Sequence, residues 1–389
     1  MPRENLLTLA ATRLARIPFA LFSDDSFSAP EKVLVLQTCC LSQVMLATPL
    51  LAVLQNAFPE ARFDWAVSDW ARPAIVGNPR LTEVISVGAE DLRKRSWRQV
   101  SNLVKRLRVE WYDTCFIVSR SGLLSYVAWQ ARIPQRIGLN VQSRGFAHTL
   151  AVRPPREEKH ASTIYLSLAR AVGIEEGAIS GVGSEFYPSD RARVAMTQYL
   201  VEEMDWLGDV PLVIMHPGGG INPVLSEPLI RWPVERFALL GNHLARHHGA
   251  RIVFVGASEE RPLAETLSGL MAVKVTNLCG QISLREVGAL CEVADLYVGN
   301  DAGPTHVAAA TGCSTLAIYG PTNPAHSKPY SSKALVIALW RDLSEVEKER
   351  PFTWDIGVTF EQAVEAADSL LERAADRSDT LAILTSRKR

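Results

Sequence analysis

The sequence predicts an α/β protein with two domains, each built on a parallel sheet, and three observations support this fold class. The chain has 389 residues, which suggests about two domains of roughly 150–200 residues each. Short apolar strand patterns alternate with helix patterns, as in parallel sheets whose crossovers are helices. The alternation weakens through the Gly- and Ser-rich stretch 175–190 and then resumes, so we expect a domain boundary near residues 185–207.

The composition is that of an ordinary globular protein, with 47% hydrophobic and 21% charged residues. The net charge is −1, so no overall attraction to nucleic acid or to an anionic membrane is expected. Nucleic-acid partners are therefore excluded, and any charged ligand needs a local site.

The cysteines form no C-x-x-C pair, and no histidine cluster has the sequence spacing of a zinc site. Several of the six cysteines lie in apolar segments, where buried thiols behave as small hydrophobic groups. We therefore expect reduced, structural cysteines in a cytoplasmic protein, and neither a bound metal nor another cofactor. The cysteines are Cys39, Cys40, Cys115, Cys279, Cys291 and Cys313.

Residues 1–30 predict an amphipathic helix followed by a linker. Arg13 and Arg16 interrupt the apolar positions, which does not fit the uninterrupted core of a signal peptide. We expect this helix to pack on the protein. The alternative is a weak peripheral contact with a membrane surface, with Arg3, Arg13 and Arg16 facing lipid headgroups.

The first domain is predicted to span residues 31–190. It opens with the strand "KVLVLQ" and the helix "VMLATPLLAVLQNAF", followed by the strands "RFDWAV" and "EVISV". The basic-faced helix "SWRQVSNLVKRLRVE" then leads to the strand "TCFIV", and a short helix and a final strand end at "QRIG".

The second domain is predicted to span residues 205–355 and repeats this alternation. Its strands are "VPLVIMH", "RIVFVGA", "VKVTNL", "DLYVGN" and "STLAIYG", with helices between them. A last helix at 359–377 is expected to cross back to the first domain. These are two Rossmann-like halves, and since parallel sheets bind ligands at the carboxyl ends of their strands, we expect the ligand in a cleft between them.

The block "ADLYVGNDAGPTHVAAATGCSTLAIYGPTNP", residues 294–324, is the most informative part of the chain. A strand ends at Asn300 and Asp301, a turn follows, and Pro304 opens a helix, a favourable first position for proline. The unpaired amides of such a helix start favour an anion, and Gly303 permits close approach of a diphosphate. Asp301 could accept hydrogen bonds from sugar hydroxyls. An ordinary strand–helix turn is the alternative.

This block resembles the donor-binding signature of glycosyltransferase family 9, the lipopolysaccharide heptosyltransferase family. The resemblance covers most of residues 31–330 through ordered blocks. They include "GNPRLTEVI", "QRIGLN", "KHASTIYLSLARAVGI", "MHPGGGINP" with "RWPVERFALL", and "GPTNP".

The resemblance implies a GT-B fold and an inverting, metal-independent transfer of a heptose. The donor would be an ADP-sugar, and the acceptor a lipopolysaccharide core or a related glycan or glycolipid in a bacterium. No Asp-x-Asp carboxylate pair suggests a metal site. The donor-binding residues implied by the family pattern are Arg231, His216, Gly218, Asp301, Ala302, Gly303 and His306.

Gln43 departs from the family pattern. Family members have an aspartate at this position, after the first strand, which is proposed to act as the base on the acceptor hydroxyl. An amide can orient a hydroxyl but cannot deprotonate it, and general-base assistance is worth roughly 10²–10⁴-fold. A second departure is Ile230, beside Arg231, where a basic residue is usual. Arg231 could stabilise the leaving diphosphate or pair with Glu235.

Several interpretations remain open. His148 or Asp69, near predicted strand ends, could supply the base, or the acceptor or the diphosphate could make a base unnecessary. Ser42 and Arg120 are expected on the acceptor side, next to Gln43. The alternative function is a degenerate homologue that binds a nucleotide sugar, or acts as a scaffold, without turnover. A nucleotide-sugar epimerase is disfavoured because such enzymes need carboxylates in the cleft.

Overall fold

The computed structural model describes residues 27–88, 96–220 and 228–386 of the chain. The predicted N-terminal helix within 1–30 therefore lies almost entirely outside the described residues. The chain divides into two compact units, one up to Val182 and one from Gly183. The boundary lies slightly before the expected one.

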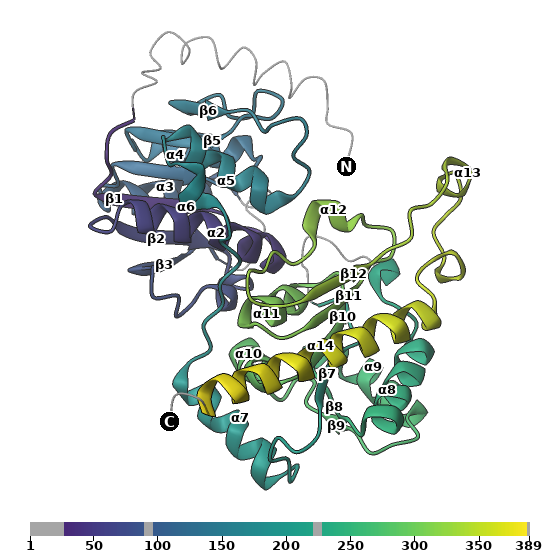
Figure 1. Ribbon diagram of the computed structural model, residues 1–389. Coiled ribbons are helices and arrows are strands. Elements are labelled where there is room, and N and C mark those ends of the chain that lie inside the picture. Colours follow the sequence, from purple (N-terminus) through teal and green to yellow (C-terminus); the bar gives the residue numbers. More distant parts are fainter. Residues whose placement is uncertain (1–26, 89–95, 221–227, 387–389) are drawn as a thin grey trace. The chain divides into compact units, whose positions relative to one another are not determined.

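The first unit contains a six-stranded sheet, as the strand patterns predict (Figure 1). Its strand order is β3-β2-β1-β4-β5-β6, and all neighbours are parallel. The sheet extends one strand beyond the prediction, since β6 had not been expected. The strands are β1 (Lys32–Leu36), β2 (Arg62–Val67), β3 (Glu83–Ser86), β4 (Thr114–Ile117), β5 (Gln135–Leu139) and β6 (Leu150–Val152).

Helices connect these strands and cover the sheet. They are α2 (Leu41–Ala57), α3 (Trp97–Val109), α4 (Gly122–Gln130), α5 (Ala161–Ala171) and the short α6 (Glu176–Ile179). The start of α3 is fixed by a reciprocal cap, in which Ser96 and Gln99 each bond the other's backbone amide. The apolar stripe of α3 then packs with α4 against the sheet, through buried residues such as Leu103 and Leu107.

The second unit repeats the topology with the order β12-β11-β10-β7-β8-β9, again parallel throughout. Its strands are β7 (Leu212–His216), β8 (Arg251–Phe254), β9 (Thr276–Asn277), β10 (Leu296–Asn300), β11 (Thr315–Ile318) and β12 (Val336–Leu339). The last of these is also one strand more than predicted. Both units therefore centre on the first and fourth strands of their own sequence.

The helices of the second unit pack on both faces of this sheet. They are α7 (Asp190–Glu202), α8 (Val234–His248), α9 (Arg261–Leu270), α10 (Leu284–Val293), α11 (Gly303–Thr311), α12 (Pro324–Ser327), α13 (Glu345–Lys348) and α14 (Phe360–Ser386). Helix α7 lies in the stretch where the sequence pattern weakens. Its residues Ala192, Met196 and Leu200 pack into the core with α10, which assigns α7 to the second unit.

The helix predicted at 359–377 is α14, and its first part belongs to the core of the second unit. Ala363, Ala367 and Leu370 of α14 are buried in the core of the second unit, together with Val213 and Phe237. Figure 1 shows α14 running across the elements of that unit, beside α8 and the sheet. The small alanines let the helix lie close to the sheet, so this helix completes its own unit.

Among the described residues, no helix is both long and apolar enough to cross a membrane.

Candidate functional site

The predicted site residues lie mostly at the carboxyl ends of the strands, where parallel sheets bind ligands. Since the two units are separate bodies, each edge is described by itself. The second unit carries the predicted donor residues, and the first carries the predicted acceptor residues.

Asn300 connects two backbone segments at the donor edge of the second unit. It ends β10 and is fully buried, and its amide nitrogen donates to the carbonyls of Pro217 and Gly218 at 3.0 and 2.8 Å. Its amide oxygen accepts from the backbone amide of Trp232 at 2.9 Å. One buried side chain thus fixes both the glycine loop after β7 and the segment that carries Arg231. Every polar group of this amide is used in positioning backbone.

His216 lies inside the second unit at the end of β7. It is fully buried, and its Nε2 lies 3.0 Å from Oε2 of Glu260, at the end of the 3₁₀ turn Ser258–Glu260. The other oxygen of Glu260 accepts from the amide of Gly220 at 2.8 Å. His216 therefore supports the glycine loop from below, as a positioning residue.

The ionised state of Glu260 is part of this support. Burial disfavours the ionised form of Glu260, and this is the largest single influence on its pKa. The charge and hydrogen bond of His216, with the amides of Ala257 and Gly220, nevertheless lower the pKa of Glu260 to about 2. The glutamate is therefore a carboxylate at neutral pH, held under the loop.

Gly218 is required by this arrangement rather than by contact with a ligand. A Cβ at this position would lie 1.8 Å from Oε1 of Glu260, closer than any real contact. Because Gly218 is buried against the carboxylate, its predicted part in donor binding is indirect.

Arg231 lies over the glycine loop and close to the start of α11. Its Nε is 3.4 Å from the place where a Cβ on Gly219 would be, and the corresponding position on Gly220 is 3.8 Å from the Cβ of Ala302. Arg231 is exposed, and among the ion pairs of the described residues it has none with Glu235. A guanidinium, the glycine loop and a helix start therefore lie close together, and the guanidinium and the helix start suit a diphosphate.

Asp301 follows β10 and is half-buried. Its Oδ2 accepts from the hydroxyl of Thr322 at 2.7 Å. Burial raises the pKa of Asp301, against the hydrogen bonds of Thr322 and Tyr319. The carboxylate is therefore held in one orientation at the helix start, beside Ala302 and Gly303.

His306 is the fourth residue of α11. Its side chain is 1% exposed, so the protein itself encloses the ring.

On the acceptor edge, Gln43 lies in the first turn of α2, two residues after Leu41 opens the helix. Its Oε1 accepts from the hydroxyl of Tyr165 on α5 at 2.5 Å. Burial raises the pKa of Tyr165 to about 12, although the charge of Arg120 and the hydrogen bond from Gln37 act in the opposite direction. Tyr165 is thus a neutral donor, and the amide of Gln43 is held in place by it.

The turn before Gln43 departs from one expectation. Cys39 and Cys40 are joined by a disulfide, whereas reduced cysteines had been predicted. Cys40 has a φ of 65°, in the left-handed region that favours glycine. The other four cysteines are free and buried, as expected of small apolar side chains.

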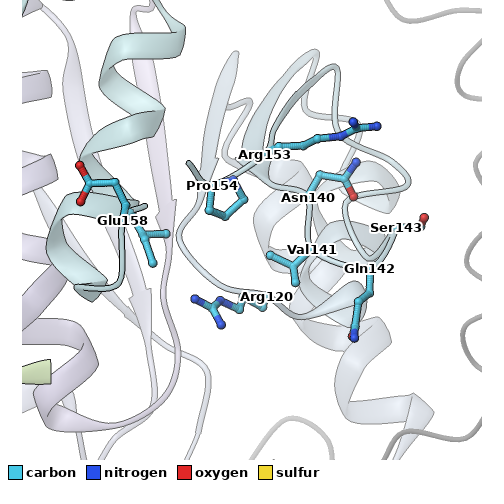
Figure 2. A pocket seen from close by; sticks show the side chains of 9 residues that line it. Arg120, Asn140, Val141, Gln142, Ser143, Arg153, Pro154 and Glu158 are labelled. Carbon is cyan, nitrogen blue, oxygen red and sulfur yellow. The ribbon is translucent and has the colours of Figure 1, made fainter. Parts of the chain in front are cut away.

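A cavity of about 490 Å³ opens beside Arg120. Figure 2 shows its lining side chains, which come from the loops after β4, β5 and β6 and from the approach to α5. They are Arg120, Asn140, Val141, Gln142, Ser143, Arg153, Pro154, Glu158 and Ile164. Two guanidiniums with amides and a hydroxyl can bind a polyhydroxylated, acidic ligand. Ser42 is half-buried in the first turn of α2 and is not among the lining residues.

The structure argues against His148 as an alternative base. Its ring is buried between two glycines, and a Cβ on either Gly138 or Gly145 would approach it to 2.5 Å. Burial lowers the pKa of His148 to about 4, so the ring is neutral but enclosed. Asp69 remains a candidate base. It is exposed and follows β2, whose end is tied to the acceptor turn by the amide of Ser68, which donates to Thr38 at 3.1 Å.

Several site residues were missed from the sequence. Glu260 is at least 40 residues away in sequence from His216 and Gly220, and no local pattern marks it. Tyr165 stands in the quoted block "KHASTIYLSLARAVGI", but its contact with Gln43 spans 122 residues. Arg153 and Glu158 stand in "AVRPPREEKH", directly before the block that resembles the family's His-containing helix. Their position next to that block is the feature of the sequence that could have pointed to these two residues.

Comparison with known proteins identifies the family. The model of glycosyltransferase family 9 (heptosyltransferase) matches residues 100–353, more than half of the chain. The chain is 26% identical over 326 residues to lipopolysaccharide heptosyltransferase 2 of Escherichia coli, with 82% of this chain and 90% of that protein covered.

Two solved structures show the same fold. A family 9 glycosyltransferase from Veillonella parvula aligns with a TM-score of 0.76 and 22% identity, covering 90% of this chain and all of that chain. The Escherichia coli ADP-heptose heptosyltransferase II aligns with a TM-score of 0.68 and 22% identity, covering 88% and 99%. With its two parallel six-stranded units the protein has the GT-B fold, and it belongs to glycosyltransferase family 9.

Proposed function

We propose that the protein transfers a heptose from ADP-heptose to a lipopolysaccharide-core acceptor, with inversion at the transferred carbon. The observation that carries this is the donor edge, where Arg231, the glycine loop and the start of α11 converge. The names of the similar proteins, which are heptosyltransferases, support heptose as the sugar and ADP as the carrier.

The donor edge supplies the charge that the leaving group needs. As the bond between sugar and diphosphate breaks, negative charge develops on the diphosphate oxygens. In our proposal Arg231 and the first amides of α11 meet that charge without a divalent cation. Asp301, oriented by Thr322, accepts hydrogen bonds from the sugar hydroxyls.

The acceptor edge recognises an acidic glycan through Arg120 and Arg153, with Asn140 and Gln142 bonding to hydroxyls. Gln43, held by Tyr165, orients the attacking hydroxyl. Its proton passes to Asp69 or to the departing diphosphate. The alternative of a protein without turnover finds no support among the relatives, which are named as transferases.

We further propose that the protein works on the cytoplasmic side of a membrane as a peripheral protein. An aromatic and basic surface on α3 and α4 supports this. Trp97 is 73% and Trp129 39% exposed, and both pack against Tyr126. Exposed Arg98 and Lys105 lie on the same helix as Trp97. Tryptophan with basic residues suits an anionic lipid surface.

The test is thermal unfolding with ADP, UDP, GDP and ADP-heptose. A ligand at about 100 times its Kd adds roughly 2.7 kcal/mol of stability, a shift of several degrees. We expect the shift with ADP and ADP-heptose, and its reduction in Asp301→Ala for the sugar nucleotide only. The matched control is Asp209→Ala, an exposed aspartate before the start of β7, at the edge of the sheet opposite to the donor residues. No shift with any nucleotide would contradict the proposal.

A further inference from the structure

A group of two histidines and one aspartate lies between α8 and α14, away from the residues assigned above. The Nε2 atoms of His243 and His248 lie 3.0 and 2.8 Å from Oδ1 of Asp368. All three side chains are partly buried, with exposures of 19%, 24% and 29%. Each offers one ligand atom, and these atoms lie within 4.8 Å of one another.

This donor set and its spacing are those of a zinc site. Zn²⁺ is bound tetrahedrally by imidazole nitrogen and carboxylate oxygen at about 2.0–2.2 Å, so neighbouring ligand atoms in such a site are separated by about 3.3 Å. The contacts of 2.8 and 3.0 Å around Asp368 are slightly shorter. A small opening of the side chains would therefore admit an ion, without movement of either helix.

Only part of this group can be seen in the sequence. His243 and His248 are five residues apart on α8, within the H-x₃₋₅-H spacing of zinc sites, which the expectation of no such spacing overlooked. Asp368 follows 120 residues later on α14, so local spacing cannot find the third member.

The place of the group separates it from sugar transfer. Helix α8 connects β7 to β8 and runs opposite to the strands, so its end at His248 lies by the start of β8 at Arg251. The donor residues lie at the other edge, after the strands end. An ion here would act on the attachment of α14 rather than on the donor.

His247, next to His248 in sequence, offers an internal comparison. It is exposed, and its ring stacks on that of His243 with centroids 4.4 Å apart. A stacked ring presents its face rather than a nitrogen to its neighbour. His247 therefore lies outside the ligand set, which leaves the fourth position of a tetrahedral ion to water.

We propose that His243, His248 and Asp368 bind one Zn²⁺ ion, which fastens α14 to α8. Binding uses the lone pair of each Nε2, so both rings carry their proton on Nδ1 in the metal-bound form. The present hydrogen bonds to Asp368 are the metal-free arrangement of the same three groups.

The first measurement is calorimetric titration of the chelator-treated full chain, without a polyhistidine tag, with zinc chloride. We expect one ion per chain. Even outer-shell partners of metal ligands are worth about 10- to 100-fold in affinity, so loss of a ligand should weaken binding by at least about 100-fold. That loss is expected in His248→Gln and Asp368→Asn.

Two controls match these variants. His247→Gln removes the adjacent histidine, and Glu365→Gln removes an exposed carboxylate one turn from Asp368 on α14. Both should bind zinc as the wild type does. Circular dichroism establishes that every variant is folded. In parallel, zinc should raise the Tm of the wild type and leave that of Asp368→Asn unchanged.

Cobalt(II) provides a readout that needs no variant, since tetrahedral coordination with nitrogen ligands gives intense visible absorption bands. The proposal is overturned if the wild type binds no stoichiometric zinc, if Asp368→Asn binds it equally well, or if His247→Gln loses it. A histidine–aspartate hydrogen-bonded tie without metal would give the first of these results.

Discussion

The two units share one sheet topology but equip their carboxyl edges differently. In the second unit the edge consists of main chain: the loop Gly218–Gly220 and the first turn of α11, with Asn300 and Glu260 bonding backbone groups from within. In the first unit the edge consists of side chains, with Arg120 and Arg153 around a cavity.

This difference explains why the donor edge could be predicted from the sequence and the acceptor edge could not. A main-chain site restricts the residues that can form it, because only glycine fits against Glu260 and only certain residues open a helix. A side-chain site can be assembled from many residue types on the same backbone. The donor edge is therefore recognisable from a short motif, whereas the residues of the acceptor edge can be replaced without a change of backbone.

The sharpest test of the acceptor edge is Gln43→Asp. A carboxylate at this position could take the proton of the acceptor hydroxyl, and Tyr165 would hold it as it now holds the amide. We expect kcat to rise by about 10²–10⁴-fold, measured by single-turnover transfer from ADP-heptose. Gln43→Asn, of the same length, should not gain. Equal rates in both variants would mean that another group already acts as the base.

The support of the donor edge should depend on pH. The pKa of Glu260 is lowered from its ordinary value of 4.5 to about 2. Its contribution to stability is therefore complete above about pH 4.5 and is lost as the pH falls toward 2. At 1.36 kcal/mol per unit, this contribution is on the order of 3 kcal/mol.

Denaturant unfolding between pH 7 and 2.5 measures this loss. Glu260→Gln should be less stable at neutral pH and should lack this part of the acid dependence. The neighbouring, exposed Glu259→Gln should behave like the wild type. An unchanged acid dependence in Glu260→Gln would assign the loss to other carboxylates.

Gly218→Ala tests whether the glycine loop is a fitted piece of main chain. The added Cβ would overlap Oε1 of Glu260, and such overpacking costs about 1–3 kcal/mol. We expect a lower Tm together with weaker ADP binding in a thermal-shift titration. Gly269→Ala, where a Cβ meets nothing within 4 Å on α9, should instead be neutral or slightly stabilising. Similar losses in both variants would contradict the fitted loop.

The last prediction concerns the cavity arginines, whose loss should affect only the acceptor. Arg120→Ala or Arg153→Ala removes a charge-assisted hydrogen bond worth about 1.5–3 kcal/mol, so the KM for the acceptor should rise about tenfold or more. The Kd for ADP, from the second unit, should not change. Arg156→Ala, an exposed arginine nearby that is not among the lining residues, is the control. A change in ADP affinity would contradict the assignment of acceptor binding to the first unit and donor binding to the second.

Much of the fold could be predicted from the sequence, because buried parallel strands such as "KVLVLQ" and "DLYVGN" are continuous apolar runs. The edge strands β6 and β12 were not predicted; both are only half-buried. In the site, Asp301, His216 and His306 all lie at or just after the carboxyl ends of β7 and β10, but His216 and His306 are buried. A histidine in a motif does not reveal whether it faces a ligand or holds the backbone, since burial is a property of the fold.

Trp232 has a consequence for handling the protein. Its backbone amide donates to the side-chain oxygen of Asn300 at the donor edge. Its indole nitrogen donates at 3.0 Å to the carbonyl of Val358, two residues before α14. The C-terminal segment and the nucleotide loop are thus linked through a single buried side chain. Removal of the chain from Val358 onward should therefore lower the affinity for a nucleotide, which a titration with ADP can measure.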